Sequence, residues 1–230
     1  LISAPPPSAG GVALAQSLGI LQQLPWQSAD KLQRSHYVVE ALRRAYRDRG
    51  LLGDPDFVTN PVAQLLAPAY LQQLASSIDP QRATPSASLT PAPAWREGDH
   101  TTHFSVLDST GNAVAATLSI NLPFGAAFSV PGTGVVLNNE MDDFAAALHG
   151  SNSYGLSGSA ANQIAAGKRP LSSMSPSFID SPEAFATFGT PGGSRIPSMV
   201  LLAMLSHLDG QPPSAWVASP RYHHQYLPDV

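Results

Sequence analysis

The sequence predicts an α+β fold, in which a helical first part is followed by antiparallel strands. Apolar residues recur at helical spacing through residues 1–79, whereas apolar and polar residues alternate from Thr101 onward, as in half-buried strands. A Pro-rich stretch, residues 80–98, separates the two parts and is expected to be an exposed linker. With 230 residues and 43% hydrophobic content, the chain can bury a sizeable core.

Three helices are expected in the first part. The first carries leucines at helical spacing and stops at Pro25. The second is expected to start at a Ser28 cap and to end at Gly50. The third starts at Pro61 and must be kinked or split by Pro68. One face of the second helix is expected to hold Leu32, Val39, Leu42 and Tyr46.

Two strands are expected to form a hairpin that begins at Thr101. A three-residue loop closes it, with Gly111 at the position that needs a positive φ. Counting back along this register places Thr101 directly opposite Ser119, with Asn121 on the same face as Ser119. The strands are expected to cover residues 101–108 and 112–121.

Shorter elements are expected to follow the hairpin. Strands are predicted at 134–137, 177–180 and 184–189. The long stretch 143–176 is rich in Gly, Ser and Asn, and loops of that length in compact domains are usually functional or disordered. An apolar helix over residues 196–208 is expected to follow Gly192 and Gly193, with Ser194 as its cap.

Composition and charge argue against several classes of function. A net charge of −4 without any Lys/Arg cluster argues against nucleic acid or an anionic membrane as a partner. There are no cysteines, so disulfides and thiolate metal sites are impossible. No apolar run approaches the ~20 residues of a membrane helix. No metal is predicted, because His103, His223 and His224 lack ligand spacing and structural hydrogen bonding is favoured.

Thr101 has two interpretations from its pattern alone. A threonine that opens a strand is commonplace, because β-branched residues favour strands. If the bond between His100 and Thr101 were cut, however, the new α-amine would have a pKa of roughly 7.7–8.0. That amine could then act as the base for the threonine's own hydroxyl. The junction of a Pro-rich linker and a hairpin is a reasonable place for such a cut.

Several segments, in the same order and spacing, resemble the γ-glutamyltransferase family of N-terminal nucleophile hydrolases. In the second part these are TTHFSVLD (101–108), GNAVA (111–115), LNNEMDDF (137–144), KRPLSSMSP (168–176), GTPGGSR (189–195) and PRYHHQ (220–225). In the first part they are PPPSAGG (5–11) and GDPDF (53–57). The resemblance therefore covers nearly the whole chain.

The resemblance implies an αββα sandwich, incomplete here, of antiparallel sheets flanked by helices. Residues 1–100 are then the C-terminal part of a large-subunit region, and residues 101–230 are a small-subunit catalytic region truncated at its C-terminus. The precursor is expected to cut itself between His100 and Thr101, giving a heterodimer of large and small subunits. Ser119 stands where the family usually has threonine, and we expect it to bond to Thr101.

The resemblance also implies roles for individual residues, each of which makes chemical sense for a γ-glutamyl group. The α-ammonium needs acceptors, the α-carboxylate needs donors, and the tetrahedral oxyanion needs fixed N–H groups. These roles are assigned to Asn121, Glu140 and Asp143 for the ammonium, Ser172 and Ser173 for the carboxylate, Gly192 and Gly193 for the oxyanion, and Tyr154 on a lid loop.

The expected function is transfer or hydrolysis of the γ-glutamyl group of glutathione and related compounds through a γ-glutamyl ester of Thr101. Water, acceptor amino acids or dipeptides resolve the ester, and no cofactor is expected. By resemblance alone the location is periplasmic or secreted. Two alternatives stay open: a cephalosporin or glutaryl acylase on the same fold, and an inactive fragment lacking an upstream carboxylate-binding arginine.

Overall fold

The computed structural model describes residues 1–89, 101–145, 159–227 and 229, and it confirms the α+β prediction. The first part is helical, with α1 (Gly10–Gln22), α2 (Lys31–Arg49), α3 (Val62–Leu65) and α4 (Pro68–Ser76). The expected third helix is split in two, because Pro68 lies in the first turn of α4 and ends the preceding helix. In the described part of the chain no helix is long and apolar enough to cross a membrane.

The strands form two separate antiparallel groups. β1 (Ile2–Ser3), β4 (Ser177–Asp180) and β5 (Phe185–Phe188) make a three-stranded sheet in the order β1-β4-β5. β2 (Thr101–Leu107) and β3 (Ala113–Ser119) make the predicted hairpin, and Gly111 has the expected positive φ of 91°. The chain then forms α5 (Ile196–Leu208) and α6 (Pro213–Ala218).

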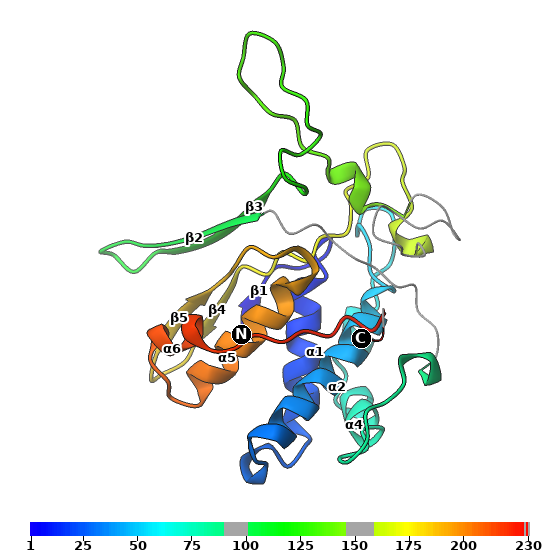
Figure 1. Ribbon diagram of the computed structural model, residues 1–230, viewed down its shortest axis with the longest axis vertical. Coiled ribbons are helices and arrows are strands. Elements are labelled where there is room, and N and C mark those ends of the chain that lie inside the picture. Colours follow the sequence, from blue (N-terminus) through cyan, green and yellow to red (C-terminus); the bar gives the residue numbers. More distant parts are fainter. Residues whose placement is uncertain (90–100, 146–158, 228, 230) are drawn as a thin grey trace.

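The elements stack in layers, helices first, then the three-stranded sheet, then the hairpin (Figure 1). Ala186 and Phe188 of β5 are buried in the main core with α1, α2 and α5. Thr187 points to the opposite face, where its hydroxyl lies 2.9 Å from that of Ser105 on β2. Because side chains alternate along a strand, Ser105 and Thr101 lie on the same face of β2, and the hairpin contacts β5 through this polar face.

The outer face of the hairpin is apolar and half exposed. Phe104, Val106, Val114 and Leu118 are between 48% and 56% exposed. These residues alternate with the docked ones, so they point away from β5. The docked layers therefore cover only one face of the hairpin.

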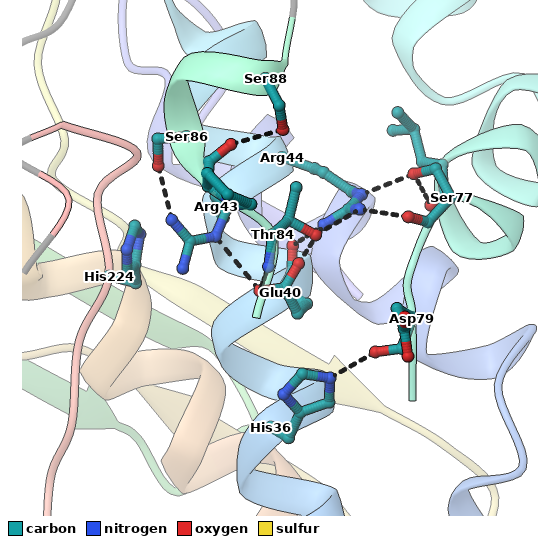
Figure 2. A network of polar contacts seen from close by, with 12 residues as sticks. His36, Glu40, Arg43, Arg44, Ser77, Asp79, Thr84, Ser86, Ser88 and His224 are labelled. Carbon is teal, nitrogen blue, oxygen red and sulfur yellow. Dashed lines mark hydrogen bonds and ion pairs between the residues drawn. The ribbon is translucent and has the colours of Figure 1, made fainter. Parts of the chain in front are cut away.

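A buried ion-pair network on α2 fixes the segment 77–86, which follows α4, in place (Figure 2). Arg44 donates to Glu40 at 2.6 Å and to the carbonyl of Ser77 at 2.8 Å, while Arg43 donates to Ser86 at 2.5 Å. Although burial opposes it, hydrogen bonds from Thr84 and Arg44 hold the pKa of Glu40 below its ordinary value. Ser86 is fully buried, so this part of the predicted linker is anchored rather than exposed.

Several local predictions are wrong. Asp30, not Ser28, caps α2, because its carboxylate accepts the N–H of Gln33 at 2.8 Å. Leu32 is 81% exposed, whereas Leu42 and Tyr46 are buried as expected. The expected strand 134–137 is reduced to one bridge, between Ser129 and Val136, and Gly134 at its expected start has a positive φ of 71°, which is not a strand conformation. Ser194 does not cap α5, since its hydroxyl donates to Gln225.

Candidate active site

The hairpin register brings the hydroxyl of Thr101 to that of Ser119. The two residues are directly paired, and Thr101 Oγ1 donates to Ser119 Oγ at 3.2 Å. Ser119 Oγ also accepts the backbone N–H of Asn121 at 2.9 Å. Asn121 has a φ of 68°, a left-handed conformation that asparagine tolerates well, and the chain turns there out of β3.

His103 lies two residues from Thr101 on the same face of β2. Its Nδ1 is 2.8 Å from Thr117 Oγ1, and its ring packs directly against Gly189. Burial lowers the pKa of His103, which favours the neutral ring at this contact. A side chain at Gly189 would occupy the space of the imidazole, so glycine is what allows the hairpin to dock closely.

The hairpin forms the first wall of the site, and an acidic turn forms the second. Asn139 ties it to the end of the hairpin, because its Oδ1 accepts the N–H of Leu122 at 3.0 Å and its carbonyl accepts from Asn121. Glu140 and Asp143 lie on the short 3₁₀ turn Glu140–Asp143 that follows. Within the described part of the chain no group donates to Glu140 Oε1, although this oxygen is buried. A buried carboxylate oxygen of this kind is suited to a cationic ligand.

A serine-rich segment forms the third wall and is pinned to the start of the chain. The N–H of Ser172 donates to Pro7 at 2.9 Å, and its carbonyl accepts from Ala9 at 2.8 Å. Ser172 lines the site, whereas Ser173 is fully buried and its hydroxyl accepts from Arg49 at 3.0 Å. The two neighbouring serines therefore have different surroundings.

The fourth wall is the entry to α5. Gly192 and Gly193 have φ values of 138° and 55°, which few other residues adopt without strain. They lead through the 3₁₀ turn Gly193–Arg195 into α5, a 13-residue helix. The positive end of the helix dipole therefore lies beside this wall.

These four walls enclose one small polar cavity. Its space, about 10 Å³, is roughly that of a single water molecule, so a larger ligand requires the lining side chains to move apart. A larger groove of about 840 Å³ lies elsewhere, between the end of α1 and the end of α5, and it is mainly apolar. The polar cavity is lined by Thr101, Ser119, Asn121, Glu140, Asp143, Ser172, Met174, Gly193 and Ile196.

The family model described as Gamma-glutamyltranspeptidase matches residues 1–230. The chain belongs to the γ-glutamyltranspeptidase family. It is 44% identical over 234 residues to a glutathione hydrolase proenzyme of Pseudomonas sp. (strain A14), covering 100% of this chain and 41% of that protein. It is 42% identical over 236 residues to a glutathione hydrolase proenzyme of Escherichia coli (strain K12), covering 99% of this chain and 40% of that protein. The chain thus spans about two fifths of the length of these relatives.

Solved members of the γ-glutamyltranspeptidase family share the fold. A crystal structure of a mutant Helicobacter pylori γ-glutamyltranspeptidase is 48% identical with a TM-score of 0.53, covering 56% of this chain and 70% of that chain. The Pseudomonas nitroreducens γ-glutamyltranspeptidase complexed with L-DON is 45% identical with a TM-score of 0.53, covering 56% of this chain and 67% of that chain.

The structure places most of the predicted site residues of this family member around one cavity, but not all. Ser173 and Gly192 are adjacent to lining residues and do not line it themselves. Tyr154 and His100 lie outside the described residues. Met174 and Ile196 line the cavity without a predicted role, although Met174 lies within the segment 168–176 and Ile196 directly follows the segment 189–195.

The histidines considered for a metal make hydrogen bonds instead. His223 Nδ1 lies 2.6 Å from Ser198 Oγ, and His224 Nε2 lies 3.3 Å from Asp229. Among the residues that the structure describes, no group of three or more His, Asp or Glu side chains could hold a metal ion.

Proposed function

We propose that the protein containing this chain cleaves and transfers γ-glutamyl groups, with Thr101 as its nucleophile. One observation carries the proposal: the cavity joins a threonine hydroxyl, a glycine-rich helix entry, a buried carboxylate oxygen and a serine from four separate segments. A γ-glutamyl group presents one electrophilic carbonyl, one ammonium and one carboxylate, and each has a chemical counterpart among these walls. The glutathione hydrolase names of the relatives support the same substrate class.

Activation of Thr101 requires a cut before it. In the intact precursor its nitrogen belongs to the amide bond with His100 and is not basic. We propose that Thr101 Oγ attacks the carbonyl of His100, that the amide nitrogen leaves as the α-amine, and that water hydrolyses the resulting ester. The freed amine then accepts the proton of the hydroxyl, which makes Thr101 a nucleophile with its own base.

Turnover then follows the same chemistry on substrate. Thr101 Oγ attacks the γ-carbonyl, and Gly192 and Gly193 stabilise the oxyanion with backbone N–H groups near the helix start. The leaving amine, cysteinylglycine in the case of glutathione, takes the proton from the Thr101 ammonium and departs. The γ-glutamyl ester of Thr101 is resolved by water or by the amine of an acceptor amino acid or dipeptide. The Thr101 amine accepts that nucleophile's proton and returns it to the hydroxyl.

Ser119 and the acidic wall complete the assignment. Ser119 holds the Thr101 hydroxyl, and Asn121, Glu140 and Asp143 bind the α-ammonium. Ser172 binds the α-carboxylate, with Ser173 and Tyr154 as further contacts. Glu140 Oε1 has no hydrogen-bond donor among the residues that the structure describes, and this favours a γ-glutamyl group, which carries an ammonium, over a glutaryl group, which carries none. We further propose a large- and small-subunit heterodimer and, from family membership alone, a periplasmic or secreted location.

Replacing Thr101 with alanine in the full-length protein tests the proposal. We expect the wild type to give two fragments whose masses divide between His100 and Thr101, and the variant to give one uncut chain without γ-glutamyl anilide turnover. A variant that is still cut, or that still turns substrate over, would remove Thr101 from its role. Faster turnover of glutaryl than of γ-glutamyl anilide by the wild type would favour the acylase alternative.

A further inference from the structure

The side chain of Asn162 joins the two segments that carry the polar walls of the cavity. Its Oδ1 accepts the backbone N–H of Leu171 at 3.0 Å, and its Nδ2 donates to the backbone carbonyl of Asp143 at 2.7 Å. Leu171 directly precedes Ser172, and Asp143 itself lines the cavity. Asn162 is only 2% exposed, so water cannot readily replace either bond.

The turn that carries Asn162 is itself fixed to the helical part of the chain. Ser159 Oγ donates to the carbonyl of Gly50 at the end of α2 at 2.5 Å, and it accepts the N–H of Ala161 at 3.1 Å. Lys168 Nζ donates to the carbonyl of Ala161 at 2.9 Å. The amide of Asn162 therefore connects the two walls from a position set by α2.

We propose that Asn162 is a positioning residue that sets the separation between the acidic wall and the serine wall. This inference rests on the proposed function. An amino acid carries its ammonium and carboxylate on one carbon, so the distance between the groups that bind them has to match. A side-chain amide suits both bonds, because one end accepts and the other donates. Alanine would make neither bond, and an ionised carboxylate would set an oxygen against the Asp143 carbonyl.

The test compares Asn162→Ala and Asn162→Asp with the wild type in the full-length protein. Fragment masses first confirm that each preparation is processed, and kcat and KM are then measured with a γ-glutamyl anilide. We expect KM to rise about 10- to 100-fold in Asn162→Ala, which is the size of effect expected when a hydrogen bond to a charged group is lost. We expect kcat to fall less than about threefold, because Asn162 does not touch the reacting atoms.

The pH dependence of KM in Asn162→Asp distinguishes a positioning role from a general loss of stability. When protonated, the introduced carboxyl group can donate to the Asp143 carbonyl and still accept from Leu171, as the amide does. The ratio of its KM to that of the wild type should therefore fall toward one as the pH is lowered. The same ratio for Asn162→Ala should stay constant with pH.

Val38→Ala is the control for destabilisation. Val38 is fully buried in α2 within the main core, and its truncation loosens packing without touching either wall. It should lower the yield of processed protein and leave KM unchanged. If processed wild type has no γ-glutamyl turnover, the proposed function and this inference both fall. If the wild type is active and the Asn162 variants keep its KM, or if acid does not restore Asn162→Asp, only the inference falls.

Discussion

Gly189→Ala should impair the protein by displacing the hairpin that carries Thr101. A Cβ on Gly189 would lie closer than 3.0 Å to the Cε1, Nδ1 and Nε2 atoms of His103, a separation that real Cβ atoms essentially never show. Gly189 does not have a positive φ, so alanine can adopt its backbone conformation and the harm is steric. To restore an ordinary contact of 3.4 Å, the ring has to move by more than an ångström.

The ring has two ways to move, and each has a calculable cost. Rotation away from Gly189 breaks the contacts of His103 with Thr117 and Ser105, at about 1 kcal/mol each. Movement of the whole strand instead shifts Thr101, and a misplacement of about 1 Å near the reacting atoms can cost roughly 100-fold in rate. Because Ser105 is bonded to Thr187 and Thr117 lies on the partner strand, we expect part of the displacement to reach Thr101.

The assay follows precursor cleavage and γ-glutamyl anilide turnover in the full-length protein. Gly189→Ala should slow both by about 10- to 100-fold. In a His103→Ala background the space of the imidazole is empty, so the same substitution should cost less than about threefold. Wild-type rates in Gly189→Ala, or an equal loss in both backgrounds, would refute the steric reasoning.

Two further predictions concern stability. Glu40→Gln should lower the free energy of unfolding by about 3–5 kcal/mol in urea titrations, because it removes the carboxylate charge that compensates the buried guanidinium of Arg44. Asp209→Asn, which breaks an exposed ion pair, should cost less than about 1 kcal/mol, and similar losses in both would contradict this reasoning. Stability should also fall as the pH drops below 6.5, the ordinary pKa of histidine. Burial lowers the pKa of both His103 and His224, so the unfolded chain binds protons first. A second loss should follow below 3.8, because hydrogen bonds from Arg169 hold the pKa of Asp54 well below that value. Asp54→Asn should reduce this second loss without abolishing it, because the pKa values of Asp108 and Asp229 are also lowered.

The hairpin could be predicted from the sequence because its determinants are local. Gly111 closes the loop, and the alternation of side chains then pairs Thr101 with Ser119 without any knowledge of the rest of the fold. The strand 177–180 was predicted with its observed bounds for a similar reason. The meeting of the four walls is not local, and it was expected only from the family resemblance.

Other features could not be predicted from any pattern in the sequence. Nothing distinguishes Asn162 from an ordinary loop asparagine until its two bonds are seen. Glu40 and Arg44 have the spacing of an exposed helical ion pair, yet both are fully buried, so the spacing of charges along α2 does not by itself reveal their burial. β1 was missed because two residues carry too little alternation to be recognised.

The proposed cut would divide the chain but not the fold. The main core contains residues from α1 and α2 before the cut and from β5 and α5 after it, so the apolar contacts do not depend on the peptide bond at His100. Buried or partly buried hydrogen bonds cross the same division, linking Ser8 to Met174, Arg43 to Asp229, Tyr46 to Ser194, Arg49 to Ser173 and Asp54 to Arg169. Four of these five bonds join α2 or the residues just after it to the second part of the chain. Helix α2 therefore fixes the serine wall and the α5 entry from the part of the chain before the proposed cut, so cleavage can release the Thr101 amine while the cavity around it keeps its geometry.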